Sequence, residues 1–235
     1  MPASRAEAQV VKASFGELFR KGEAIDLRGG EATKKAVREA LPKARYAHFA
    51  THGFIDPEEE EGRKPILGAL ERPDGRQAGM GWHPLPLSGL ALSDANLVPK
   101  EGEEEGILTA LEVSEMDLTR SELAVLSACE TGLGEEAGGE GLLGMQRAFA
   151  VAGARSVVSS LWKVDDKATQ QLMQEFSAHA WGKKVVSRAE ALRAAQLSML
   201  KHGASRGMRR KDDEDKSERL PPYYWAAFVL SGDWR

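Results

Sequence analysis

Short apolar runs bounded by polar residues alternate along this chain with segments whose apolar residues recur at helical spacing. The short runs indicate buried strands, and apolar residues three and four positions apart indicate helices packed by one face. We therefore expect helices at residues 4–20, 31–41, 141–154, 165–181 and 187–203. We expect strands at residues 44–51, 122–128, 155–162 and 223–232, a strand or hairpin at 84–95, and a helical turn or connector at 107–118. This alternation predicts an α/β fold with a mostly parallel sheet and helices on both faces.

Several boundaries carry local signals. Gly153 is suited to end the helix at 141–154, because glycine adopts the backbone conformation that follows many helices. Ser187 is the expected N-cap of the helix that follows it, with Glu190 three residues on. High charge predicts solvated loops at residues 56–64, 100–106 and 204–222. Neither a repeat nor a linker divides the chain, so we expect one domain over residues 1–235.

Composition narrows the classes of function. The 235 residues carry a net charge of −4, so no excess of positive charge attracts nucleic acid or an anionic membrane. The one cysteine cannot form an internal disulfide or a cysteine-rich zinc site, and a reducing compartment fits it best. The N-terminus lacks the layout of a signal peptide, and no apolar run approaches the ~20 residues needed to cross a bilayer. We expect a cytoplasmic protein that binds neither nucleic acid nor a membrane directly.

Two histidines, His48 and His52, lie four positions apart in "HFATH". The helical zinc-protease motif requires glutamate directly after the first histidine, and Phe49 stands there, so we expect no metal site. We interpret His48 as a structural residue within a strand. His52 lies at the strand's exit and is followed by Gly53, and strand ends of open α/β sheets are where ligands and catalytic groups gather. His52 is therefore a candidate functional residue.

The stretch "GEGLLG", residues 139–144, matches the glycine pattern of dinucleotide-binding proteins, and Asp165 follows at nearly the expected distance. The first glycine of that pattern makes the tight turn directly out of a strand. Here residues 129–138 intervene, which argues against a phosphate site at the helix N-terminus. No lysine and serine or threonine follow the glycines, so a P-loop is excluded. A nucleotide-binding enzyme is left as an alternative.

The single cysteine, Cys129, follows the clearest buried strand in "SELAVLSACETG". A lone cysteine at such a place is either inert packing or a nucleophile. A nucleophilic thiol needs a base or cation beside it, because a free thiol titrates near ~8.5. His52 leaves another predicted strand, and two adjacent parallel strands would bring their exits together. The residues alone leave both interpretations of Cys129 open.

Four stretches together resemble the CHAT domain, a caspase- and separase-like cysteine peptidase module that often follows helical repeats in bacterial proteins. They are "HFATHG", "LSACETG", "GEGLLGMQRAFAVAGARSVVSSLWKVDD" and "YYWAAFVLSGDW", and the resemblance extends from Arg5 to Trp234. It implies a caspase-like sheet, and the order of His52 before Cys129 agrees with it. Their separation of 77 positions (129 − 52) exceeds the ~50 typical of caspases. "SACETG" departs from the caspase signature, so specificity for aspartate is not implied.

The resemblance implies roles for individual residues. Cys129 would be the nucleophile and His52 the general base. No third residue that orients His52 is identifiable in the sequence, and relatives of this type generally act as a dyad. The backbone N–H groups of Gly53 and Cys129 would form the oxyanion hole. "LWKVDDK" resembles the separase segment in which an aspartate recognises arginine, which makes Asp166, the matching position, and Asp165 beside it the candidates for the first specificity pocket. Either Asp165 or Asp166 could instead cap the following helix.

These implications lead to an expected function. The chain would be a cysteine endopeptidase without a cofactor that cleaves protein or peptide substrates after a basic residue. The resemblance also implies regulation by a helical-repeat region or partner protein, and roles in bacterial defence or programmed death. The absence of a strand before the first helix indicates a domain excised from a longer chain. The alternatives are a non-catalytic CHAT-like interaction module and the nucleotide-binding enzyme described above.

Overall fold

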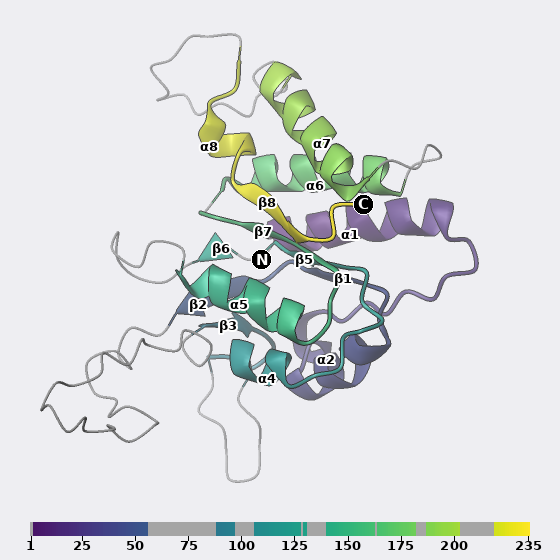
Figure 1. Ribbon diagram of the computed structural model, residues 1–235, viewed down its shortest axis with the longest axis vertical. Coiled ribbons are helices and arrows are strands. Elements are labelled where there is room, and N and C mark those ends of the chain that lie inside the picture. Colours follow the sequence, from purple (N-terminus) through teal and green to yellow (C-terminus); the bar gives the residue numbers. More distant parts are fainter. Residues whose placement is uncertain are drawn as a thin grey trace, which may run out of the picture.

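Helices and strands fill most of the chain that the structure, a computed structural model, describes (Figure 1). The described residues are 2–55, 88–96, 106–127, 129–130, 140–162, 164–181, 187–202 and 219–235. The α-helices are α1 (Pro2–Leu18), α2 (Lys34–Ala40), α4 (Ala110–Ser114), α5 (Glu140–Val151), α6 (Asp166–Ala180), α7 (Arg188–His202) and α8 (Pro222–Trp225). Two short 3-10 helices occupy Gly29–Glu31 and Leu41–Lys43.

The strands form two sheets of four. The first sheet has the order β1-β5-β7-β8, with bounds Tyr46–Phe49, Leu123–Leu126, Ser156–Ser160 and Phe228–Gly232. Its strands β1, β5 and β7 are parallel, and β8 is antiparallel to β7. The second sheet has the order β4-β3-β2-β6, with bounds Ile107–Thr109, Ser88–Ala91, His52–Ile55 and Cys129–Glu130. In it β2 and β6 are parallel, and the other neighbours are antiparallel.

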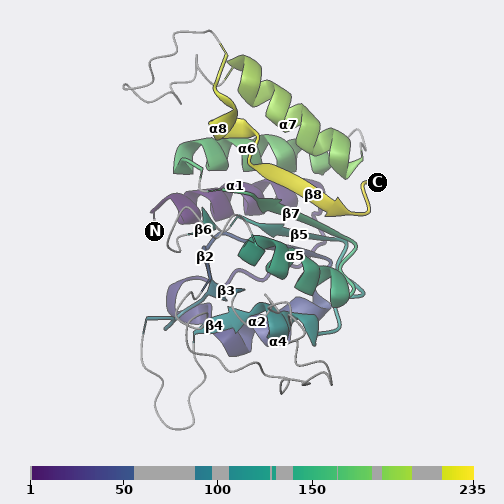
Figure 2. The same ribbon diagram turned by 60° about the vertical axis from the view of Figure 1, so that its left-hand side comes forward.

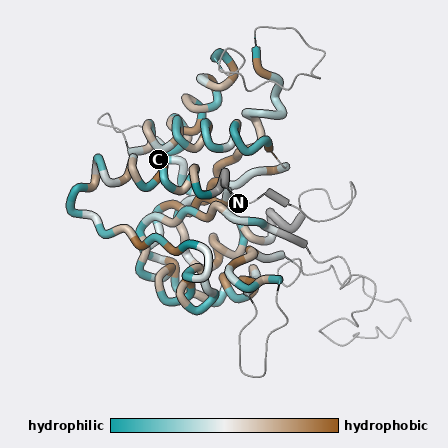
Figure 3. Tube along the Cα trace, turned by 180° about the vertical axis from the view of Figure 1, so that it is seen from behind, coloured by the Kyte–Doolittle hydropathy of each residue, from teal (hydrophilic) through white to brown (hydrophobic). Residues whose placement is uncertain are grey.

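Helices cover both faces of the central sheet, which confirms the predicted α/β class (Figures 1 and 2). Strand β5 shows how the sequence produces the two layers, because all four of its residues are buried and alternate residues point to opposite faces. Leu123 and Val125 pack in the core with α1, α6 and α7. Ala124 and Leu126 pack in the other core, with α2, α4 and α5. Figure 3 shows hydrophobic segments gathered in the interior of the molecule and hydrophilic ones on the outer turns of the helices.

The predicted boundary signals are confirmed. Gly153 follows α5 with φ 103°, a left-handed conformation that favours glycine. The Ser187 hydroxyl accepts the N–H of Glu190 at 3.2 Å, and the Glu190 carboxylate accepts the N–H of Ser187 at 3.0 Å, so α7 begins with a capping box. The predicted loop 56–64 lies outside the described residues, as do most of 100–106 and 204–222.

Three predicted elements differ from the structure. The strand expected at 44–51 ends at Phe49, and β2 begins at His52, so His52 opens a new strand. Residues 107–118 contain β4 before α4, because Thr109 ends the strand and caps the helix through a capping box with Glu112. Residues 223–232 begin in α8, where Pro222 at the first helical position favours a helix start over a strand.

Candidate active site

One register connects the two sheets. Strands β1 and β5 pair with Tyr46 opposite Leu123, and strands β2 and β6 pair with His52 opposite Cys129. Both pairs have the same separation of 77 positions (123 − 46 and 129 − 52). Between them the Ser127 N–H donates to the Phe49 carbonyl at 2.9 Å. The short pair β2–β6 is therefore the continuation of the buried pair β1–β5, and the register of the core places His52 opposite Cys129.

His52 lies in the inner part of the second sheet. Its strand β2 has β6 on one side and β3 on the other, where His52 is opposite Ala91. The neighbouring Thr51 hydroxyl donates to the Ala91 carbonyl, which ties the start of β2 to β3. The His52 ring is half-buried and has no hydrogen-bond partner among the described residues.

Gly53 is buried and continues the same ladder, opposite Leu90 on one side and Glu130 on the other. The resemblance seen in the sequence implies an oxyanion role for its N–H group. The paired strands thus bring together all three residues expected at the catalytic centre, namely His52, Gly53 and Cys129, through their backbones.

His48 has a separate, structural place. Its Nε2 lies 2.8 Å from Glu7 Oε1, and the two side chains are 14% and 7% exposed. Because Glu7 belongs to α1 and His48 to β1, this buried pair fixes the first helix to the edge strand. Among the described residues no cluster of histidine, cysteine, aspartate or glutamate is arranged to hold a metal ion.

The two aspartates after β7 have different environments. Asp165 is the N-cap of α6, and its Oδ1 accepts the N–H groups of Lys167 at 3.0 Å and Ala168 at 3.2 Å. Asp166 is the first helical residue, and its side chain is exposed. Capping therefore occupies the Asp165 carboxylate and leaves Asp166 as the candidate for binding a basic side chain.

The glycine stretch at 139–144 is mostly helical. Helix α5 begins at Glu140, so Gly141 and Gly144 lie inside it, and Gly139 lies outside the described residues. A dinucleotide site uses a glycine loop at the helix N-terminus. The early start of α5 argues against that use.

Two apolar residues beside the carboxyl end of β7 received no role from the sequence. Leu161 is 38% exposed, and the half-buried Trp162 donates its indole N–H to the Tyr223 carbonyl at 3.0 Å. Tyr223 itself is 40% exposed. An exposed apolar group at the carboxyl end of a central parallel strand is a signal for a binding surface. In the sequence this signal is carried by "SSLW", at the end of the strand predicted at residues 155–162.

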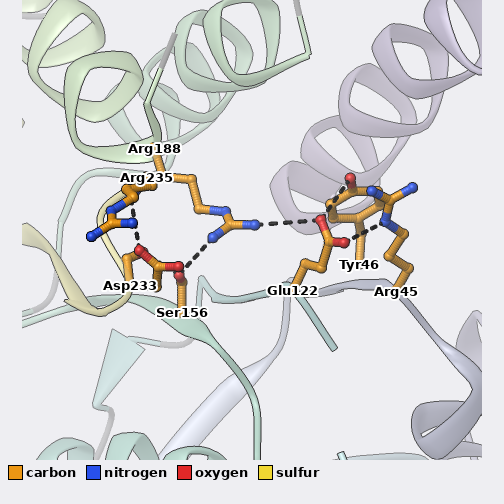
Figure 4. Close-up of polar contacts among 7 residues, drawn as sticks. All are labelled: Arg45, Tyr46, Glu122, Ser156, Arg188, Asp233 and Arg235. Carbon is orange, nitrogen blue, oxygen red and sulfur yellow. Dashed lines mark hydrogen bonds and ion pairs between the residues drawn. The ribbon is translucent and has the colours of Figure 1, made fainter. Parts of the chain in front are cut away.

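A polar network holds the opposite end of the parallel strands, as Figure 4 shows. Glu122, just before β5, accepts from Arg45 at 2.8 Å, from Tyr46 at 3.2 Å and from Arg188 at 3.4 Å. Burial raises the pKa of Glu122, but the hydrogen bond from Arg45 and the nearby positive charges outweigh it and leave that pKa below its usual value. Burial also raises the pKa of the Tyr46 phenol. The network joins β1, β5 and α7 and therefore supports the register that continues to His52.

Comparison with known proteins agrees with the resemblance seen in the sequence. The profile of the CHAT domain matches residues 1–233. Tetratricopeptide repeat protein 28 of Mus musculus is 28% identical over 244 residues, and its counterpart in Homo sapiens is 27% identical over 245 residues. Each alignment covers 99% of this chain but only 8% of the relative's length.

These relatives carry tetratricopeptide repeats by name, in keeping with the expected association with helical repeats. No helix among the described residues is both long enough and apolar enough to span a membrane. The family match covers essentially the whole chain, and the sheet with helices on both faces agrees with it. The chain belongs to the CHAT domain family, which is related to the caspase-like cysteine peptidases.

Proposed function

We propose that this protein is a cysteine endopeptidase in which Cys129 is the nucleophile and His52 the general base. The observation that carries the proposal is the register of β2 and β6, in which His52 is opposite Cys129. Neighbouring strands lie about 4.8 Å apart, so a histidine and a cysteine at one register position are close enough for proton transfer between their side chains. The family match supports membership of a family related to the caspase-like cysteine peptidases.

The reaction follows from these two groups. His52 accepts the thiol proton, and the Cys129 sulfur bonds to the carbonyl carbon of the scissile peptide. The backbone N–H groups of Gly53 and Cys129 donate to the oxyanion that forms, a kind of contact worth about 10²–10³ in rate. The carbon–nitrogen bond then breaks as His52 returns the proton to the leaving amine. Water activated by His52 hydrolyses the thioester and restores the thiol.

Specificity for a basic residue is the finer part of the proposal. Asp166 is exposed at the start of α6, and β7, the strand before it, lies beside β5. A carboxylate at the base of a pocket would bind arginine with two parallel hydrogen bonds and lysine as a point charge. A peptide panel varied at this position tests it. Equal cleavage after aspartate or leucine would contradict the specificity for a basic residue but not the proposed peptidase activity.

The central experiment compares wild type with Cys129→Ala on a random peptide library. We expect cleavage by the wild type, no cleavage by Cys129→Ala and the same melting temperature for both. His52→Gln should also be inactive, whereas His48→Gln, a matched loss of histidine four positions earlier, should retain cleavage. Cleavage by Cys129→Ala would contradict the proposal. Inactivity of the wild type together with stabilisation by NAD or ATP would favour the nucleotide-binding alternative.

The single thiol gives a second readout that needs no substrate. Iodoacetamide should alkylate Cys129 at pH 7 faster in the wild type than in His52→Ala by about tenfold, because a neighbouring imidazole increases the thiolate fraction. Equal rates in the two proteins would mean that His52 does not act on Cys129. Equal alkylation rates together with the absence of peptide cleavage would support the alternative that the protein is a non-catalytic interaction module.

The proposal extends to regulation and compartment. The relatives that match this chain are tetratricopeptide repeat proteins, and helical repeats bind partner proteins on extended concave surfaces. We propose that a helical-repeat region or partner controls access to the site. A reactive thiol also needs a reducing compartment, which the cytoplasm provides.

A further inference from the structure

Strand β1 is an open edge of the central sheet. Within the described residues it pairs with β5 only. The carbonyls of Arg45 and Phe49 accept the N–H groups of Leu123 and Ser127, at 3.4 and 2.9 Å. Backbone groups alternate along a strand, so those of Tyr46 and His48 point away from β5. An edge of this kind offers donors and acceptors to another strand.

A cavity of about 1570 Å³ lies along this edge. It is lined by β1 and by residues of α1, of α2 and of the segment 22–29. Val11 of α1 and Val37 of α2 both line it, although they belong to the two cores on opposite faces of the sheet. The cavity therefore lies between the two helix layers, in the plane of the sheet, where a strand next to β1 would lie.

The walls of this cavity, which we call the edge groove, are mainly apolar. Phe15, Trp181 and Phe49 are among its lining residues. Ile25, also in the lining, is 60% exposed, which is unusual for a large aliphatic side chain beside a core. A strand buried on both faces has apolar residues at consecutive positions. The groove therefore suits a run of apolar residues.

The charged residues that line the edge groove indicate which residues would flank the apolar run of a bound segment. Arg5 and Lys43 line it and have no ion-pair partner among the described residues. The Asp26 carboxylate accepts from Arg28 at 2.7 Å and from Lys12 at 2.8 Å, and these hydrogen bonds, that of Arg28 first, lower its pKa. Glu23 is the other acidic residue of the lining, so the groove holds more cationic side chains than carboxylates, and this excess of positive charge favours an acidic group.

We propose that the edge groove binds an extended segment of a partner polypeptide, which adds to β1 as a strand. The segment has about four apolar residues, matching the four of β1, with acidic residues at its ends. Its backbone bonds to the outward groups of Tyr46 and His48, and its side chains cover Ile25. The groove also reaches Thr51 and His52, so the bound strand would lie beside the candidate base.

Hydrogen exchange of the purified 235-residue protein tests this proposal without any need for catalysis. The probe is the acetylated, amidated peptide Asp-Val-Ile-Val-Ile-Asp, and the control has proline at its third and fifth positions, which removes two backbone donors. We expect the probe to slow exchange at the Tyr46 and His48 amides. The Ala47 amide, which faces β5, should be slow with and without the probe. No protection of Tyr46 and His48, or equal protection by the proline peptide, would overturn the proposal.

A pair of surface variants locates the site. Ile25→Lys places a charge in the groove, whereas Val151→Lys changes a residue that is 71% exposed on α5 and does not line the groove. We expect Ile25→Lys to weaken the probe at least tenfold and Val151→Lys to leave it unchanged. A probe with lysine at both ends should bind more weakly than the acidic one. The same amides could instead become protected in a concentrated sample without peptide, together with a dimer in sedimentation. That result would identify a second copy of the chain as the occupant and contradict the proposal.

Discussion

The two sheets of this protein differ in burial and in chemistry. Strands β5 and β7 of the first sheet are buried along their whole length, and their alternate residues fill two cores. The pair β2–β6 of the second sheet has only two register positions, yet it holds both candidate catalytic residues. Both pairs share one register of 77 positions. The buried strands of the first sheet therefore fix the alignment that places the two candidate residues of the second sheet opposite each other.

The largest expected contrast is between a core residue of β5 and the candidate base. Leu126 is fully buried, so Leu126→Ala should lower the free energy of unfolding by about 2–5 kcal/mol. His52→Gln should change that free energy by less than about 0.5 kcal/mol and abolish cleavage. Urea unfolding together with peptide cleavage measures both. A stable Leu126→Ala protein or a strongly destabilised His52→Gln protein would contradict the division of roles.

The pair of Glu7 and His48, on α1 and the edge strand β1, should matter for stability and not for cleavage. Glu7→Ala removes the buried carboxylate 2.8 Å from the His48 ring, and the loss should cost about 1–3 kcal/mol of stability because a buried polar group is left unpaired. Cleavage by the remaining folded protein should continue. Loss of cleavage without loss of stability would place this pair in the active site.

The two aspartates at the start of α6, the N-cap Asp165 and the first helical residue Asp166, separate capping from recognition. Asp165→Ala should destabilise the protein by about 0.5–2 kcal/mol, because it removes the acceptor for two N–H groups. Asp166→Ala should have little effect on stability and should abolish the preference for a basic residue. Thermal melting and the peptide panel distinguish the two. A loss of stability in Asp166→Ala and a loss of the basic preference in Asp165→Ala would mean that Asp166 caps the helix and Asp165 binds the substrate.

The smallest effect concerns Glu122, whose carboxyl has a pKa below its usual 4.5 in the folded protein. A lowered pKa stabilises the fold above that usual value, and the contribution is lost as the pH falls through the folded value. Glu122→Gln should therefore cost about 0.2–1 kcal/mol at pH 7 and less below pH 4. Urea unfolding at both pH values measures the difference. A cost that grows in acid would contradict the charge network.

The sequence predicted the layers of the fold better than its strand breaks. Helices such as α6 and α7 follow from periodicity and caps, and β5 follows from its uninterrupted apolar run. The break between β1 and β2 at Ala50 and Thr51 could not be predicted, because "HFATH" reads as one strand leading into a loop. The Thr51 hydroxyl that bonds the Ala91 carbonyl depends on a strand 40 positions away. Long-range pairing of this kind leaves no local pattern.

The sequence indicated which residues belong to the candidate site, but not the strand register that places them opposite each other. The sequence predicts His52 and Cys129 at strand exits 77 positions apart, but it does not show that this separation is the register of two paired strands. Pairing of Tyr46 with Leu123 is needed to see that the same number is the register of the core. The assignment of Asp165 as a cap also needed hydrogen-bond geometry, because either aspartate fits that position by type.

The most direct test of the central claim measures the register itself. The chain has one cysteine, so His52→Cys creates a single possible pair with Cys129. Adjacent strands lie about 4.8 Å apart, within the Cα separations of about 4.4–6.8 Å that disulfides span. The account predicts an intramolecular disulfide by mass spectrometry after mild oxidation of His52→Cys and none in Thr51→Cys. A disulfide in Thr51→Cys, or none in His52→Cys, would contradict it.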